Sequence, residues 1–170
     1  MDLANNYAIV GAYGSGTDPG GASIYERDFS TGVWSPTPVA EITGATGFGT
    51  GVALTDSYAI VGSYSEMKSY LYVRDVTTGL WDTTARRTFD SYTDQSQFGV
   101  SGAMTDSHAL IGARNANKAY FFSTTLHPET CQDWYDLGHR TTGMYTLESG
   151  AGQSYTTKCD MDRHGGGWTH

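Results

Sequence analysis

Apolar residues recur along this chain in short runs that end in glycine and are separated by polar turns. The clearest run, residues 98–112 (FGVSGAMTDSHALIG), repeats residues 48–62 (FGTGVALTDSYAIVG) at a distance of fifty residues. The second half of the pattern occurs once more at residues 5–11 (NNYAIVG). A fixed period of about fifty residues is typical of repeat architectures. Each short run is typical of a β-strand.

One repeat predicts about four strands: a Phe-Gly strand, an Ala-Ile-Val-Gly strand, a tyrosine-rich strand and a tryptophan strand. In the first repeat we expect strands at 7–11 and 22–28, followed by a turn at 30–32 that leads into Trp34. The second repeat has the same order and ends at Trp81. The glycine of each Thr-Gly turn is expected to adopt a positive φ. The first repeat lacks the Phe-Gly strand, and the third lacks the tryptophan strand.

Residues 4–122 resemble the FG-GAP-like repeats of extracellular and cell-surface β-propellers. The resemblance implies an all-β fold with two to three four-stranded propeller-type blades, which is an incomplete propeller. An unrelated sandwich with a duplicated hairpin is the alternative. The motif positions with an implied structural role are Phe48, Gly49, Gly62, Phe98, Gly99, Gly112, Trp34 and Trp81.

Some members of this family bind calcium in an Asp-x-Asp-x-Asp-Gly loop between the first two blade strands. The corresponding loops here, 13–20, 64–68 and 114–118, contain at most one acidic residue each. Because calcium requires several converging carboxylate and carbonyl oxygens, we expect no calcium in the repeats.

A closed propeller needs at least four blades, which is more than this chain contains. An incomplete stack leaves strand edges and apolar faces exposed. Three explanations are open: the chain is a piece of a longer protein, its C-terminal segment completes the last blade, or another copy supplies the missing strands. In the third case we expect strand-edge complementation, in which the Tyr120 strand of one copy pairs with the Tyr7 strand of the next. The product would be a homo-oligomer or polymer, as a ring or a filament.

The composition changes after the repeats. We expect domains at 1–123 and 131–170, joined by a linker at 124–130. The chain has only two cysteines, Cys131 and Cys159, and they suggest one disulfide and an oxidising compartment. Two free buried thiols are the alternative.

The C-terminal segment, residues 131–169, resembles the opening of a fibrinogen C-terminal-like domain. The matching positions are Cys131, Thr142–Leu147 (TGMYTL), Cys159–Met161 (CDM) and 165–169 (GGGWT). The resemblance implies a disulfide between the two cysteines in a small β module. The calcium site and the carbohydrate pocket of that family lie in the part of the domain that this segment lacks, so no ligand residue is carried over.

Charge and hydropathy exclude several partners. The net charge of −8 and the pI near 4.8 argue against nucleic acid, which requires clustered Lys and Arg. No apolar run is long enough to span a membrane. We also expect no signal peptide within this chain, because Met1 leads almost directly into a repeat. An export signal, if one exists, was removed or lies outside this chain.

No catalytic motif, metal-ligand spacing or phosphate loop occurs in the sequence, so we expect neither an enzyme nor a cofactor. The sequence predicts an extracellular or cell-surface structural or adhesion protein that self-assembles or belongs to a larger surface protein. The alternative is a carbohydrate-binding, lectin-like module, for which the exposed aromatic residues Trp134 and Tyr135 are candidate ligand or interface residues. A glycan or an extracellular protein is the expected ligand.

Overall fold

The computed structural model describes residues 1–90, 97–124, 130–136, 141–148, 154–162 and 167–169. The chain divides into two compact units, Met1–Thr125 and Leu126–His170. The described residues form four small antiparallel sheets with few helical residues, so the predicted all-β class is confirmed. These sheets do not form a closed propeller. Most of the predicted linker, residues 125–129, lies outside the described part of the chain.

Three of the sheets belong to the first unit, and each is a meander in which every strand pairs antiparallel with its neighbour along the chain. Sheet 1 contains β1 (Asp2–Leu3), β2 (Tyr7–Ala12), β3 (Gly20–Glu26) and β4 (Ala40–Gly44). Sheet 2 contains β5 (Phe48–Leu54), β6 (Tyr58–Ser63), β7 (Lys68–Val73) and β8 (Arg87–Asp90). Sheet 3 contains β9 (Phe98–Met104), β10 (His108–Ala113) and β11 (Lys118–Ser123), with the short 3-10 helix η1 (Arg114–Ala116) between the last two.

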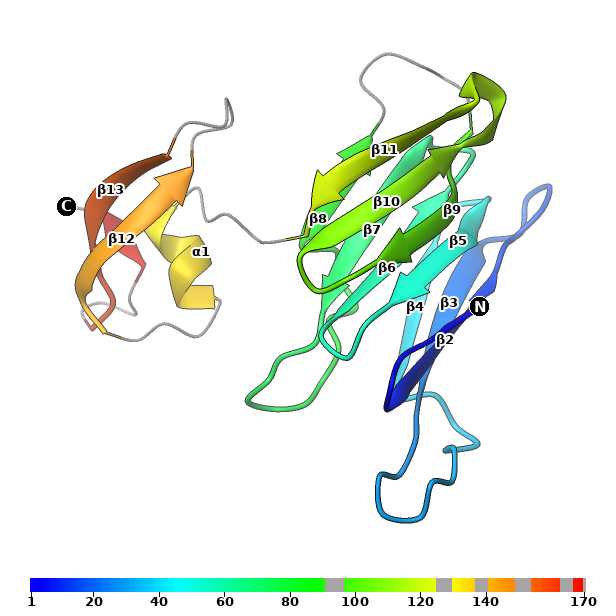
Figure 1. Ribbon diagram of the computed structural model, residues 1–170, viewed down its shortest axis with the longest axis horizontal. Coiled ribbons are helices and arrows are strands. Elements are labelled where there is room, and N and C mark those ends of the chain that lie inside the picture. The colour runs from blue at the N-terminus through cyan, green and yellow to red at the C-terminus, as the bar shows by residue number, and fades with distance from the viewer. Residues whose placement is uncertain (91–96, 125–129, 137–140, 149–153, 163–166, 170) are drawn as a thin grey trace. The chain divides into compact units, whose positions relative to one another are not determined.

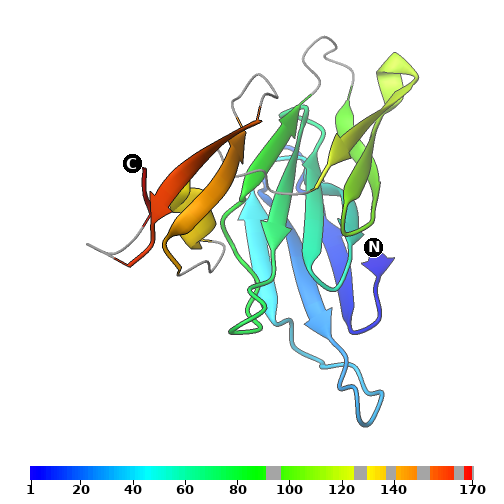
Figure 2. The ribbon, with the colours of Figure 1, turned by 60° about the vertical axis from the view of Figure 1, so that its left-hand side comes forward.

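Sheet 2 lies between the other two sheets, because β5 contacts β2 on one side and β9 on the other (Figures 1 and 2). Burial follows from this order. In β6 every residue from Ala59 to Ser63 is buried, whereas burial largely alternates along β2 and β10. Strands with one covered face alternate and strands with two covered faces do not. Sheets 1 and 3 therefore each have one face that no described sheet of this unit covers.

The two interfaces between these sheets are apolar. Between sheets 1 and 2, Ile9 and Ile24 pack in one cluster with Phe48, Leu54 and Val61. Between sheets 2 and 3, the aromatic rings of Phe89 and Phe122 lie 4.8 Å apart between centroids, and Phe98 is completely buried. Burial of such side chains contributes about 1.5–3 kcal/mol each.

The Phe-Gly motif forms a bulge at the start of β5 and at the start of β9. The register shifts after Phe48 in β5, and Gly49 has φ +86°; in β9, Gly99 has φ +90°. The bulge brings the backbone of each glycine against the preceding sheet, where a Cβ on Gly11 or Gly62 would overlap a carbonyl oxygen. Close backbone approach and positive φ both require glycine.

The expectation of a tryptophan strand is wrong. Trp34 and Trp81 form only isolated bridges to Arg27 and Arg74, and the outer strands β4 and β8 begin six residues later. After Trp34 the chain reads Ser-Pro-Thr-Pro, and proline cannot donate to a strand ladder. The positive φ predicted for the turn glycines is confirmed, at +72° for Gly32 and +75° for Gly79.

The expected pairing between copies requires the Tyr7 strand to be an edge strand, and this expectation is also wrong. Ala8 and Ile9 of β2 pair with β1 on one side and with β3 on the other. The N-terminal residues thus occupy part of the position of the missing Phe-Gly strand.

The second unit contains α1 (Cys131–Asp136) and a sheet of β12 (Gly143–Glu148), β13 (Ser154–Asp160) and β14 (Trp168–Thr169). A reciprocal cap starts α1, because Asp133 N donates to Thr130 Oγ1 and Thr130 N donates to Asp133 Oδ2. The core of this unit consists of Cys131, Leu147, Cys159 and Met161. No helix among the described residues is both long and apolar enough to cross a membrane.

Candidate functional site

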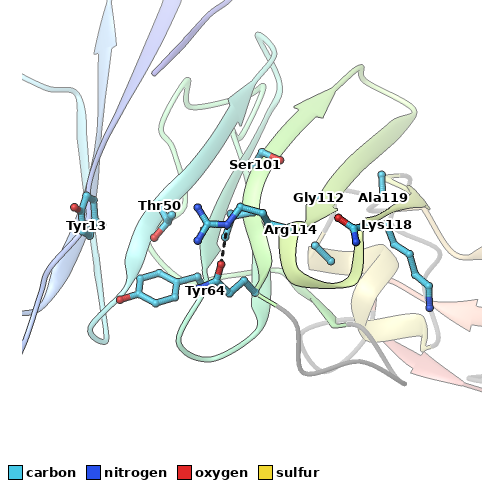
Figure 3. Close-up of a pocket in the computed structure, with 12 residues that line it drawn as sticks. Tyr13, Thr50, Tyr64, Ser101, Gly112, Arg114, Lys118 and Ala119 are labelled. Carbon is cyan, nitrogen blue, oxygen red and sulfur yellow. Dashed lines mark hydrogen bonds between the residues drawn. The ribbon is translucent and has the colours of Figure 1, made fainter.

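A hollow of about 1040 Å³ opens at one end of the stacked sheets of the first unit (Figure 3). Residues from all three sheets and their loops line it. They are Tyr13, Thr50, Tyr64, Gln97, Val100, Ser101, Gly112, Ala113, Arg114, Asn117, Lys118 and Ala119.

The repeat pattern explains why these side chains converge. In each repeat, one lining residue comes directly after the strand that carries the Ile/Val-Gly motif. Tyr13 follows β2, Tyr64 follows β6 and Arg114 follows β10. They are therefore equivalent positions in three stacked sheets, and the third repeat has a guanidinium where the first two have phenol rings. Arg114 Nε donates to Gln97 Oε1 at 3.1 Å, which fixes the arginine beside the start of β9 (Figure 3).

The lining combines polar groups with aromatic and small apolar residues. It contains two phenol rings, a guanidinium, an ammonium group, two hydroxyls and two amides, and none of these described lining residues is an acid. In a chain of net charge −8, this hollow suits a polar ligand that is neutral or anionic. The described lining residues include no histidine, cysteine or carboxylate. Among the described residues, no three His, Cys, Asp or Glu side chains are grouped closely enough to hold a metal ion.

The motif residues singled out in the sequence lie mainly between the sheets. Phe48, Gly49, Gly62, Phe98 and Gly99 are buried there. Gly112 differs, because no other described sheet of this unit covers it: a Cβ there would meet mainly the Ser101 side chain of its own sheet. Sequence reasoning did not identify the hollow, although the variation Tyr13, Tyr64, Arg114 at one repeat position was visible in the sequence.

The two tryptophans have different environments. Trp81 is buried, and its ring lies 5.4 Å from that of Tyr7 in an edge-to-face arrangement. The Tyr7 hydroxyl donates to Glu26 Oε1 at 3.0 Å, and burial, as the main cause, together with this carboxylate raises the pKa of Tyr7. Trp34 is more exposed, at 38%. Trp81 thus joins sheet 2 to sheet 1, whereas Trp34 lines a second hollow together with Asp56 and Arg74.

In the second unit, Cys131 and Cys159 form the predicted disulfide, with their Cα atoms 5.4 Å apart. Beside it, the buried carboxylate of Asp160 accepts from Thr142 Oγ1 at 3.2 Å and from Asp162 N at 3.1 Å. These contacts give Asp160 a structural role.

Trp134 is half-buried rather than exposed as expected. Its Nε1 donates to Thr146 O at 2.9 Å, and its ring lies 5.4 Å from that of Tyr145. The indole therefore helps to hold α1 on the sheet of its own unit. The side chain of Tyr135 lies outside the described residues, so its predicted ligand role stays a prediction.

Comparison with protein families agrees with the resemblance of the C-terminal segment. Domains of the fibrinogen type are extracellular and often take part in binding or recognition. Together with the disulfide, this similarity indicates an extracellular protein. Residues 127–170 match the family of the fibrinogen beta and gamma chains, C-terminal globular domain.

Proposed function

We propose that this chain is an extracellular structural or adhesion protein that self-assembles, or forms part of a larger surface protein, and uses its stacked sheets as an interaction scaffold. The observation that carries the proposal is an apolar surface at each end of the stack. Leu110 of sheet 3 is 43% exposed and Val10 of sheet 1 is 41% exposed. Their counterparts in the covered sheet 2, Ile60 and Val61, are 1% and 0% exposed.

Repeat proteins bury each repeat against its neighbours, and their end repeats normally carry a polar outer face. Here the end sheets retain apolar residues at positions that are buried in sheet 2. Large exposed apolar patches are typical of interaction sites. We infer in addition that sheets 1 to 3 are FG-GAP-like propeller blades. Their common meander order and the Phe-Gly bulges of sheets 2 and 3 support this inference. The proposal includes no enzymatic activity.

A carbohydrate-binding role is the second candidate, and the hollow beside Tyr13, Tyr64 and Arg114 favours it. Sugars bind through stacking on aromatic rings and through hydrogen bonds from fixed polar groups. Binding to a glycan array that is lost in Tyr64→Ala and retained in Trp134→Ala would place the ligand in this hollow. The reverse result would place it in the fibrinogen-like unit.

Light scattering of the purified chain over a range of concentrations, with and without reductant, tests self-assembly. We expect species larger than the 18.3 kDa chain that grow with concentration. A mass of 18.3 kDa at all concentrations would contradict self-assembly. Loss of the assemblies on reduction alone would mean that assembly depends on a disulfide rather than on the sheets, and non-reducing electrophoresis would show whether that disulfide joins two chains.

A further inference from the structure

The two internal interfaces of the first unit are built in the same way. We call the face of a sheet that points toward the next sheet along the chain its forward face, and the opposite face its backward face. In each interface, the forward face of one sheet covers the backward face of the next. The forward face of sheet 2 is represented by Ala53, Ile60 and Leu71, which lie side by side on β5, β6 and β7. The backward face of sheet 2 is represented by Leu54, Ala59, Val61 and Tyr72, which pack against sheet 1.

The backward face of sheet 1 has the same four residue types in the same register. Leu3 pairs with Ala8 as Leu54 pairs with Ala59, and Ala8 pairs with Tyr25 as Ala59 pairs with Tyr72. Val10 occupies the position of Val61. In sheet 2 all four residues are buried against sheet 1. In sheet 1 no described sheet of this unit lies over them, and Leu3 and Val10 are 61% and 41% exposed.

The forward face of sheet 3 is the complementary surface. Leu110 pairs with Ala103 and Phe121, as Ile60 pairs with Ala53 and Leu71. Phe121 is 69% exposed, whereas Leu71 is fully buried. The ring of His108 stacks on Phe121 at 4.9 Å and extends the same surface.

We propose that the forward face of sheet 3 binds the backward face of sheet 1 of a second copy of this chain. This inference rests on the proposed self-assembly and names the two surfaces that carry it. The contact would continue the relation that joins sheet 1 to sheet 2 and sheet 2 to sheet 3. It is face-to-face stacking, and so it does not require β2 to be an edge strand.

Two different surfaces meet in this contact, so the assembly is head-to-tail and forms a closed ring or an open filament. Two copies supply six sheets, within the four to eight of closed propellers.

Two single variants block the two surfaces separately. Val10→Asp places a carboxylate on the backward face of sheet 1, and Leu110→Asp places one on the forward face of sheet 3. Burying an unpaired charge is strongly unfavourable, so each variant alone should weaken assembly by about 100-fold or more. Val76→Asp is the matched control, because Val76 is 80% exposed in a turn outside both faces, and it should assemble like the wild type.

Mixing the variants gives the sharper result. The Val10→Asp chain retains the forward face and the Leu110→Asp chain retains the backward face, so an equimolar mixture should form a one-to-one dimer although each variant alone is monomeric. Far-UV circular dichroism checks that both variants fold, and Leu3→Asp with Phe121→Asp forms a second pair on the same faces. Assembly of either single variant at wild-type concentrations, or a mixture that stays monomeric, would overturn the pairing while leaving self-assembly intact. A monomeric wild type would overturn both.

Discussion

The carbonyl oxygen of Gly99 occupies the space that a side chain on residue 62 would need. Gly49 and Gly11 have the same relationship between sheets 1 and 2. The Phe-Gly motif of one repeat and the Ile/Val-Gly motif of the preceding repeat are therefore two halves of one contact. Their joint recurrence follows from backbone packing between sheets.

Gly62→Ala should unfold or severely destabilise the first unit, because its Cβ would overlap a backbone carbonyl that no rotamer change can remove. We expect a loss of about 3 kcal/mol or more in the free energy of unfolding, as for severe overpacking. Urea denaturation monitored by tryptophan fluorescence measures it. Gly32→Ala is the matched control: Gly32 has φ +72° with open space around it, so that change should cost only about 1–2 kcal/mol. Equal losses in the two variants would contradict the role of the backbone contact.

The repeat period made most of the first unit predictable. A strand that is covered on both faces, such as the one that contains Val61, appears in the sequence as an uninterrupted apolar run ended by glycine. The motifs Phe48-Gly49 and Phe98-Gly99 recur at the same repeat position and mark the start of the next strand pattern. The disulfide between Cys131 and Cys159 was predictable because no other cysteine is present.

Other features depended on contacts that the local pattern does not show. The outer strands β4 and β8 were missed because a large aromatic residue, Trp34 or Trp81, is a stronger strand signal than Ala40–Gly44 or Arg87–Asp90. The helix α1 has only six residues, and its signal was the capping pair Thr130 and Asp133. The hollow joins residues from three repeats, and no single segment could indicate it.

Removal of the disulfide should unfold the second unit selectively. The bridge closes a loop with a sequence separation of 28, which corresponds to about 3–4 kcal/mol in the chain-entropy model. The small core around Leu147 cannot replace that contribution. We expect Cys131→Ala/Cys159→Ala to lose amide exchange protection in β12 and β13 while β5 and β6 keep theirs. Retained protection throughout would show that the unit folds without the bridge.

Asp28 should titrate with an unusually low pKa. Its Oδ1 accepts from Ser30 Oγ and from the backbone N of Ser30 and Thr31, and these hydrogen bonds lower its pKa to about 2. A lowered folded-state pKa means that the turn is stabilised above about pH 4, the ordinary pKa of Asp, and that this stabilisation is lost as the pH falls toward 2. Carboxyl NMR titration measures the pKa directly. Ser30→Ala removes the first of these donors and should raise it, whereas Thr17→Ala, in a distant loop, should not.

Alkaline pH should loosen the interface between sheets 1 and 2 through Tyr72. Burial, with the nearby Tyr70 and Glu66 as smaller causes, raises the pKa of Tyr72 to about 12, because the phenolate would be poorly solvated between the sheets. A raised folded-state pKa means that the neutral phenol stabilises the fold below about pH 10, and that this stabilisation is lost as the pH rises from 10 to 12. Tyr72→Phe should therefore reduce the fall in the free energy of unfolding over this range, measured by urea denaturation at fixed pH steps. Tyr13→Phe changes a phenol that is 62% exposed and should leave the alkaline profile unchanged. An unaltered profile in Tyr72→Phe would mean that other tyrosines control the alkaline transition, and ultraviolet difference titration of the two variants would show which phenols ionise late.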